Sequence, residues 1–164
     1  MRRTTRKLRA AVLAAVSATL LAGTVALAPG AGAVTPDRAS APYNCGQWGL
    51  SDAEFTATQL GTSATITVTL PSITVPLPVQ ADSLTSTLQL ARTDGSWPIA
   101  FTGPLANPTL TVGDPLTVGP LHAWVTPGDI LDSWGTGSQL RIQIWGLTII
   151  CSPRAPLFPG PFVF

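Results

Sequence analysis

Charged residues are scarce in this chain of 164 residues, and lysine is almost absent from it. Only 10% of the residues carry a charge, and the single lysine, Lys7, lies near the start. Beyond residue 33 the chain has four arginines against eight acidic residues, which gives a net charge of −4. Binding to nucleic acid or to anionic lipid requires clustered lysine and arginine. We therefore expect no nucleic-acid partner and no basic membrane anchor.

Residues that bind metals are equally few. The chain has two cysteines, Cys45 and Cys151, and neither has a histidine or another cysteine close to it in the sequence. That spacing does not fit a zinc site. Asp129 and Asp132 carry oxygen atoms that calcium prefers, but a dedicated calcium loop is much denser in acids. We expect no metal and no cofactor.

His122 is the only histidine. To act as a general base it would need a carboxylate and a nucleophile within hydrogen-bond reach. Asp129, Asp132 and Ser133 follow it in the sequence, but no nucleophile elbow surrounds them. A solvent-facing histidine in a strand is the simpler interpretation, so we assign no catalytic residue and expect no enzyme.

The one long apolar run stands at the start of the chain. Five basic residues between positions 2 and 9 precede an apolar run at 10–28, and Ala31-Gly32-Ala33 supplies small residues after it. This three-part layout is typical of a secretory signal peptide at residues 1–33. A retained membrane anchor is the alternative, and Arg2-Arg3 leaves both Sec and twin-arginine export open. We expect cleavage, with the product extracellular or associated with the cell wall and without a membrane anchor.

Two cysteines in an exported chain indicate one disulfide, Cys45–Cys151, because the extracellular compartment is oxidising. The disulfide would clamp the first and last strands of a single domain. Closing a loop of about a hundred residues removes roughly 4–5 kcal/mol of denatured-state entropy in the simplest model.

Short strands separated by turn signals make up most of the chain. In Ser63–Leu70 apolar residues alternate with threonine, the period of a half-buried strand. Asp94-Gly95 is a strong hairpin signal, and Trp97, Ile99 and Phe101 then share one face of the returning strand. About seven to nine such strands favour a sandwich or a barrel. We predict an all-β fold, an antiparallel β-sandwich of immunoglobulin or Greek-key type.

Finer details of the layout also follow from the sequence. Residues 34–42 are expected to be a linker, residues 43–152 the domain, and residues 153–164, with four prolines, an extended tail. Thr126–Asp132 is the one stretch that looks helical, for one or two turns. Ser138–Cys151 is expected to be the closing strand, with a β-bulge at Trp145-Gly146 where the apolar positions change parity.

Tryptophan is frequent for a chain of this size. Exposed indoles stack on sugar rings or anchor protein partners. Strand alternation places Trp124 beside His122 on an outer face, Trp134 stands in a Gly-rich loop, and Trp48 is flanked by glycines. These three tryptophans are the candidate ligand-binding residues. The alternative is that most of the tryptophans are core or half-buried residues. All five are Trp48, Trp97, Trp124, Trp134 and Trp145.

The layout as a whole is similar to a known family. Tyr43-Asn44-Cys45 near the start of the domain, the late Thr126-Pro127-Gly128 element and a closing strand that ends in Cys151 resemble a family of secreted actinobacterial β-sandwich domains. That family has a single disulfide and no known function, and the resemblance covers roughly Tyr43 to Cys151. It implies an exported domain and no catalytic residues.

The leading hypothesis is a secreted, monomeric, non-enzymatic domain that acts by surface binding in the cell envelope or the extracellular space. A cell-wall glycan or an extracellular protein would be its partner. A carbohydrate-binding module that uses exposed tryptophans is the first alternative. A small secreted hydrolase or protease inhibitor is the second, although such inhibitors typically have more than one disulfide.

Overall fold

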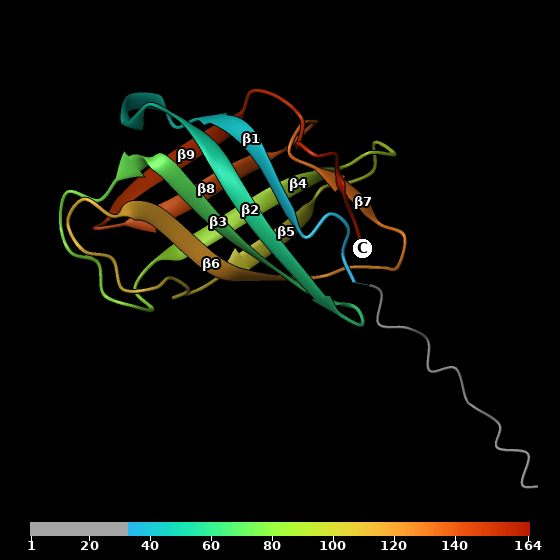
Figure 1. Cartoon of the computed structure of the whole chain (residues 1–164), viewed down its shortest axis with the longest axis horizontal. Helices are drawn as coiled ribbons and strands as arrows, with labels where there is room; N and C mark the ends of the chain where they lie inside the picture. Colours follow the sequence, from blue (N-terminus) through green and yellow to red (C-terminus); the bar gives the residue numbers. More distant parts are fainter. Residues whose placement is uncertain (1–32) are drawn as a thin grey trace, which may run out of the picture. The chain divides into compact units, whose positions relative to one another are not determined.

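The computed structural model describes residues 33–164, so the predicted signal peptide lies, apart from its last residue, outside the described residues. Antiparallel strands dominate this part of the chain (Figure 1). The elements are β1 (Arg38–Asn44), the 3-10 turn η1 (Gly46–Trp48), β2 (Leu50–Leu60), β3 (Ser63–Thr74), β4 (Thr85–Arg92), β5 (Ile99–Gly103), β6 (Pro115–Trp124), β7 (Ile130–Asp132), β8 (Gln139–Ile144), β9 (Leu147–Pro153) and β10 (Phe162–Val163). No helix within residues 33–164 has the length and apolarity to cross a membrane.

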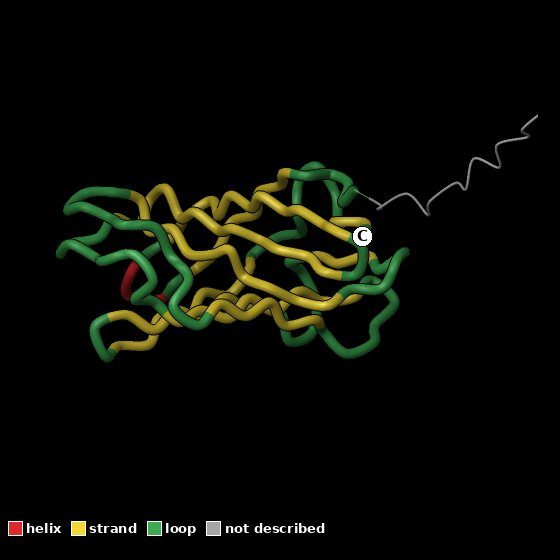
Figure 2. Tube along the Cα trace, turned by 90° about the horizontal axis from the view of Figure 1, so that it is seen from below, coloured by secondary structure: helices red, strands yellow, loops and turns green. Residues whose placement is uncertain are grey.

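Eight strands close into one antiparallel barrel (Figures 1 and 2). Their order is β4-β5-β6-β3-β2-β1-β9-β8, and β8 pairs back onto β4. The short strands β7 and β10 extend from the end of β4. The all-β antiparallel prediction is confirmed, but the strands form a closed barrel rather than the two separate sheets of the predicted sandwich. Closure leaves these eight strands without a free edge.

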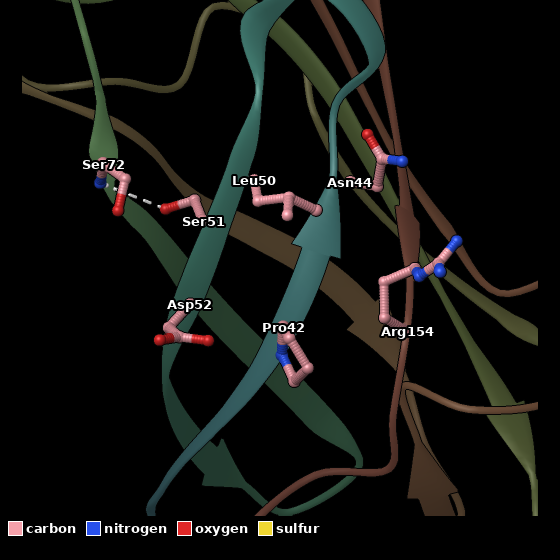
Figure 3. A pocket seen from close by; sticks show the side chains of 7 residues that line it. All are labelled: Pro42, Asn44, Leu50, Ser51, Asp52, Ser72 and Arg154. Carbon is pink, nitrogen blue, oxygen red and sulfur yellow. Dashed lines mark hydrogen bonds between the residues drawn. The ribbon is translucent and has the colours of Figure 1, made fainter.

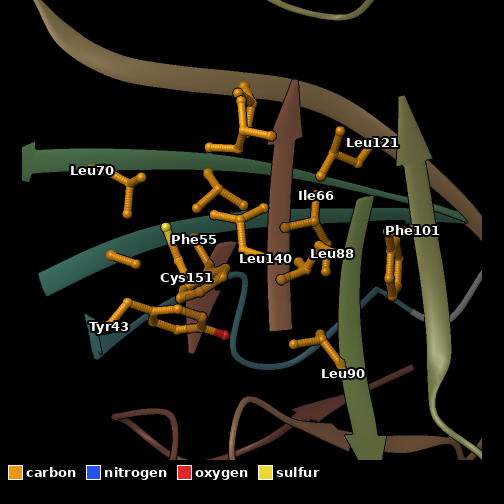
Figure 4. Packing of buried hydrophobic residues seen from close by; sticks show 14 of the residues in the cluster. Tyr43, Phe55, Ile66, Leu70, Leu88, Leu90, Phe101, Leu121, Leu140 and Cys151 are labelled. Atoms are coloured by element: carbon orange, nitrogen blue, oxygen red, sulfur yellow. The ribbon is translucent and has the colours of Figure 1, made fainter. Parts of the chain in front are cut away.

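The interior of the barrel is filled with side chains, as is usual for eight strands. In β3 the apolar positions Ala64, Ile66, Val68 and Leu70 are fully buried, which confirms the alternation predicted for this strand. Other strands contribute large side chains to the same core (Figure 4). The labelled examples are Tyr43, Phe55, Leu88, Leu90, Phe101, Leu121 and Leu140.

Trp145-Gly146 forms a tight turn between β8 and β9. The two residues have φ values of 50° and 75°, and Ile144 pairs with Leu147 across them. Positive φ at both central residues is the signature of the two-residue hairpin turn that matches strand twist. The prediction of one closing strand with a β-bulge is therefore wrong, because a hairpin changes the parity of the apolar positions just as a bulge does.

The helix predicted over Thr126–Asp132 does not form. Residues 126–129 make a turn that leads into β7, and the backbone N–H of Thr126 donates to Asp129 Oδ2 at 2.8 Å. Arg92 forms an ion pair with Asp129. Asp129, one of the acids that suggested the start of a helix, instead stabilises this turn. In residues 33–164 helical structure is limited to η1.

The segment expected to be a linker, residues 34–42, belongs to the barrel. Arg38–Asn44 is strand β1, which lies between β2 and β9. Upstream of it Val34 is buried, and Thr35 exchanges backbone hydrogen bonds with Val163 at 3.0 and 2.8 Å. The prediction failed because small and polar residues are compatible with a strand when its neighbours supply the apolar contacts.

The proline-rich tail, residues 153–164, is ordered against the barrel rather than free. Pro153 ends β9, and residues 162–163 form β10. Ser40 and Phe158 exchange backbone hydrogen bonds at 2.8 Å. The side chains of Leu157, Phe162 and Phe164 are buried. The prediction of a tail without regular structure is wrong, because the apolar residues between the prolines have a core to bury in.

The predicted disulfide, Cys45–Cys151, is confirmed, with a sequence separation of 106. It lies beside the contact between β1 and β9, where only Tyr43↔Pro153 and Asn44↔Ser152 are in register. Tyr43 is fully buried there, and burial, together with the negative charge of Asp132, raises the pKa of its hydroxyl. The phenol therefore stays protonated well above the pH at which an exposed tyrosine ionises.

Gly119 allows β6 to approach β3 closely. Its φ is 116°, and a Cβ atom on it would come within 2.8 Å of the carbonyl oxygen of Ile66. We expect Gly119→Ala to lower the free energy of unfolding by about 3 kcal/mol, because strained backbone and overlap add. Gly95→Ala is the matched control, with φ of 78° and open space around it, and should cost only about 1 kcal/mol. Urea denaturation would measure both, and equal losses would contradict this account.

Candidate functional site

Polar side chains form a row across the outer surface of four neighbouring strands. Thr58 on β2 pairs with Thr65 on β3, Thr65 pairs with His122 on β6, and His122 pairs with Thr102 on β5. The hydroxyls of Thr58 and Thr65 are 2.6 Å apart, so one donates a hydrogen bond to the other. Adjacent strands lie about 4.8 Å apart. This threonine–histidine row therefore presents hydroxyls and an imidazole at regular intervals.

Trp124 stands beside this row, two residues beyond His122 on β6. Its side chain is 79% exposed, and His122 is also exposed, whereas Leu121 and Val125 are buried. The predicted orientation of Trp124 and His122 is thus confirmed. Ser63 pairs with Trp124 on one side and with Leu60 of β2 on the other. Apolar and polar groups therefore lie next to one another on this outer face.

Trp134 lies in the loop between β7 and β8, and its side chain is 54% exposed. It lines a recess of about 470 Å³ with Thr136, Ser138, Ser152 and Pro153, among others. Asp132 holds the start of this loop, because its Oδ1 accepts hydrogen bonds from the backbone N–H of Trp134 at 3.2 Å and of Leu157 at 2.8 Å.

Trp48 does not join the other two predicted ligand-binding residues. It is half-buried in η1 and packs against the core. η1 precedes Leu50 at the start of β2, whereas Trp124 lies level with Leu60 at the end of that strand. The length of β2 therefore separates Trp48 from Trp124.

Trp97 was predicted to share one face of a strand with Ile99 and Phe101, but its side chain is 90% exposed whereas Phe101 is buried. Strand β5 begins only at Ile99, so the alternation does not extend back to Trp97. The residue belongs instead to the hairpin that turns at Asp94-Gly95, where Gly95 N donates to Arg92 O at 3.1 Å. The predicted hairpin is confirmed. Its turn at Asp94-Gly95 is the sequence signal that could have indicated an exposed Trp97.

A second recess, of about 510 Å³, lies over the outer face of β1 (Figure 3). Asp52 and Arg154 stand on opposite sides of it with Pro42 between them. Ser51 lies at its edge and accepts a hydrogen bond from the backbone N–H of Ser72 at 3.1 Å. The recess has charges of both signs on its rim and no aromatic side chain among its lining residues.

The acids that follow His122 in the sequence are engaged elsewhere. Asp129 pairs with Arg92, and Asp132 accepts hydrogen bonds from the loop and the tail. The cross-strand partners of His122 are the threonines Thr65 and Thr102. Within residues 33–164, no cluster of three or more His, Cys, Asp or Glu side chains is placed to hold a metal ion.

Fold and surface together define a class: an antiparallel β-barrel with a single disulfide and an outer face of indole, imidazole and hydroxyl groups. Comparisons with models of protein families, with curated proteins and with solved structures found no match for the chain. Function is therefore inferred from the chemistry of these residues.

Proposed function

We propose that this protein is an exported, non-enzymatic binding protein that recognises a neutral glycan on the outer face of β2, β3, β6 and β5. One observation carries the proposal: the exposed indole of Trp124 lies beside the threonine–histidine row. An indole packs against the apolar face of a sugar ring. Hydroxyl and imidazole groups both donate and accept hydrogen bonds, which suits the hydroxyls around that ring.

The charge of this surface favours an uncharged ligand. The row and its neighbour Trp124 include no lysine, arginine, aspartate or glutamate. Recognition of phosphate, sulfate or carboxylate groups relies on arginine or lysine. A net charge of −4 beyond residue 33 further disfavours anionic polymers.

Export is supported by the disulfide, because such bonds persist in oxidising compartments. A glycan of the cell wall or its surroundings would be accessible there. An extracellular protein is the other partner proposed for this surface, since an exposed tryptophan also anchors protein interfaces. The two partners are distinguished by whether isolated sugars bind.

Removal of the indole tests the proposal. We expect Trp124→Ala to weaken binding of a neutral glycan about tenfold, because the variant loses stacking worth about 1 kcal/mol or more. Titrations would follow the quenching of tryptophan fluorescence by soluble β-1,4-linked glucose and N-acetylglucosamine oligosaccharides. The same samples, analysed for released sugars, would reveal hydrolysis if the protein were an enzyme.

Trp145→Ala is the control for this experiment. Trp145 lies in the turn between β8 and β9, and neither strand borders β6 in the barrel. Its removal should leave the affinity unchanged. Equal losses in the two variants, or no binding of any neutral oligosaccharide to the intact protein, would refute a glycan site at Trp124.

A further inference from the structure

The surface around Trp124 continues onto β4 and β8. Pairing of His122 with Thr102 places Ala100 of β5 level with Trp124, because the strands are antiparallel. Ala100 pairs with Gln89 of β4, and Gln89 pairs with Gln139 of β8. The side chains that lie side by side across β6, β5, β4 and β8, which we call one level of the barrel, are therefore an indole, a methyl group and two amides.

The two glutamines form a polar bridge across this level. Gln139 Nε2 donates a hydrogen bond to Gln89 Oε1 at 2.7 Å, and both side chains are half-buried. Each amide still has further donor or acceptor capacity for a ligand. Ser138, the residue before Gln139, lines the recess of Trp134. The level that begins at Trp124 thus ends at that recess.

The loop that carries Trp134 is seated on β4. A Cβ atom on Gly135 would lie 2.5 Å from the Cβ of Ala91, and the backbone N–H of Ala91 donates to Ser138 Oγ at 3.1 Å. On the β5 side, a Cβ on Gly137 would meet Pro98 at 3.2 Å. Pro98 directly follows Trp97, so this loop reaches the hairpin on which Trp97 is exposed.

We propose that this surface binds a linear, neutral oligosaccharide chain at several positions rather than a single sugar. One sugar stacks on Trp124, a second occupies the recess of Trp134, and Trp97 and the glutamine pair contact the chain between them. Along the curved outer wall of the barrel, the path from β6 to β8 covers three strand spacings, about 14 Å, which exceeds one sugar ring. The inference rests on the proposed function and deepens it by naming the length of the ligand.

The uncharged character of the track supports this ligand. Its residues are tryptophan, alanine, glutamine, serine, threonine, glycine and proline, without a formal charge among them. Indoles separated by hydroxyls and amides match a polymer whose repeating units each present an apolar face and a rim of hydroxyls. A single sugar would use only one of the exposed indoles.

Chain length tests the inference. Oligosaccharides of β-1,4-linked N-acetylglucosamine and of β-1,4-linked glucose, from disaccharide to hexasaccharide, would be titrated by calorimetry against the intact chain. We expect affinity to rise about tenfold or more with length before it levels off. Trp134→Ala should remove this gain while leaving the affinity for the disaccharide unchanged, and Trp124→Ala should lower affinity at every length.

Trp134→Phe and Trp145→Ala serve as controls. Phenylalanine retains a stacking surface, so Trp134→Phe should keep part of the gain and would show that Trp134→Ala does not act by unfolding the loop. Trp145→Ala should behave as the intact protein. The chain-binding inference would be overturned if affinity did not depend on chain length, or if Trp134→Ala kept the full gain in affinity with length. In either case, weaker binding by Trp124→Ala would still support a glycan site at Trp124. Absence of binding to every oligosaccharide would overturn both.

Discussion

Replacement of both Cys45 and Cys151 by alanine should lower the free energy of unfolding by about 4–5 kcal/mol. The disulfide closes a loop with a sequence separation of 106, so its loss frees nearly the whole domain in the denatured state. Domains of this kind are stable by about 5–15 kcal/mol in total. A loss of this size would lower the melting temperature by about 15 °C.

The position of the disulfide in the barrel adds to this effect. β1 and β9 share two register pairs, whereas β2 and β3 share seven. The covalent bond therefore stabilises the junction between β1 and β9, the first and last strands of the barrel along the chain, which have few backbone hydrogen bonds to each other.

Urea denaturation of the double variant, and of the intact chain in reductant, would measure the loss. The two samples should agree, because alanine and a free thiol both remove the cross-link. A transition midpoint that does not move in either sample would contradict the predicted role of the bond.

Local patterns predicted the alternating strand β3 and the hairpin between β4 and β5, but they missed β1, β7 and β10. Alternation in β3 depends only on neighbouring residues, and so does the exposure of Trp124 and His122. Closure of the barrel was less accessible, because the pairing of β4 with β8 joins residues such as Gln89 and Gln139 that lie far apart in the sequence. A strand with one buried face reads the same in a sandwich and in a barrel.

In the candidate site, too, features with a local sequence signal were predicted and features that depend on strand pairing were not. The sequence indicated Trp124 and Trp134, but the threonine–histidine row depends on the registers of four strands and has no local signal. Trp48 was misjudged because flanking glycines suggest exposure, whereas the residue packs against the core. Trp97 was missed because alternation was extended past the start of β5.

The tail was misjudged for a compositional reason. Prolines cannot donate to a ladder, which favours irregular structure, but they do not stop the residues between them from being buried. Leu157, Phe162 and Phe164 are all buried, and the tail runs beside the first part of the chain from Asn44↔Ser152 to Thr35↔Val163. The tail and the disulfide thus hold together the same two ends of the domain.

Phe162→Ala should therefore lower the free energy of unfolding by about 3–5 kcal/mol, as for other large side chains removed from a core. The ring of Phe162 is fully buried, and its centroid lies 6.1 Å from that of Phe164, which in turn lies 6.0 Å from Phe101 of β5. The truncation leaves a cavity in this aromatic cluster and loosens β10 from β7.

Val163→Ala is the matched control, because Val163 is the next residue of β10 and its side chain is partly exposed. Its backbone hydrogen bonds to Thr35 do not depend on the side chain, so we expect a loss of about 1 kcal/mol or less. Urea denaturation followed by near-ultraviolet circular dichroism would compare the two variants. Only burial of the Phe162 ring would make two neighbouring positions of one strand differ so strongly. If Phe162→Ala lowered the free energy of unfolding no more than Val163→Ala, the tail would not be part of the packed core.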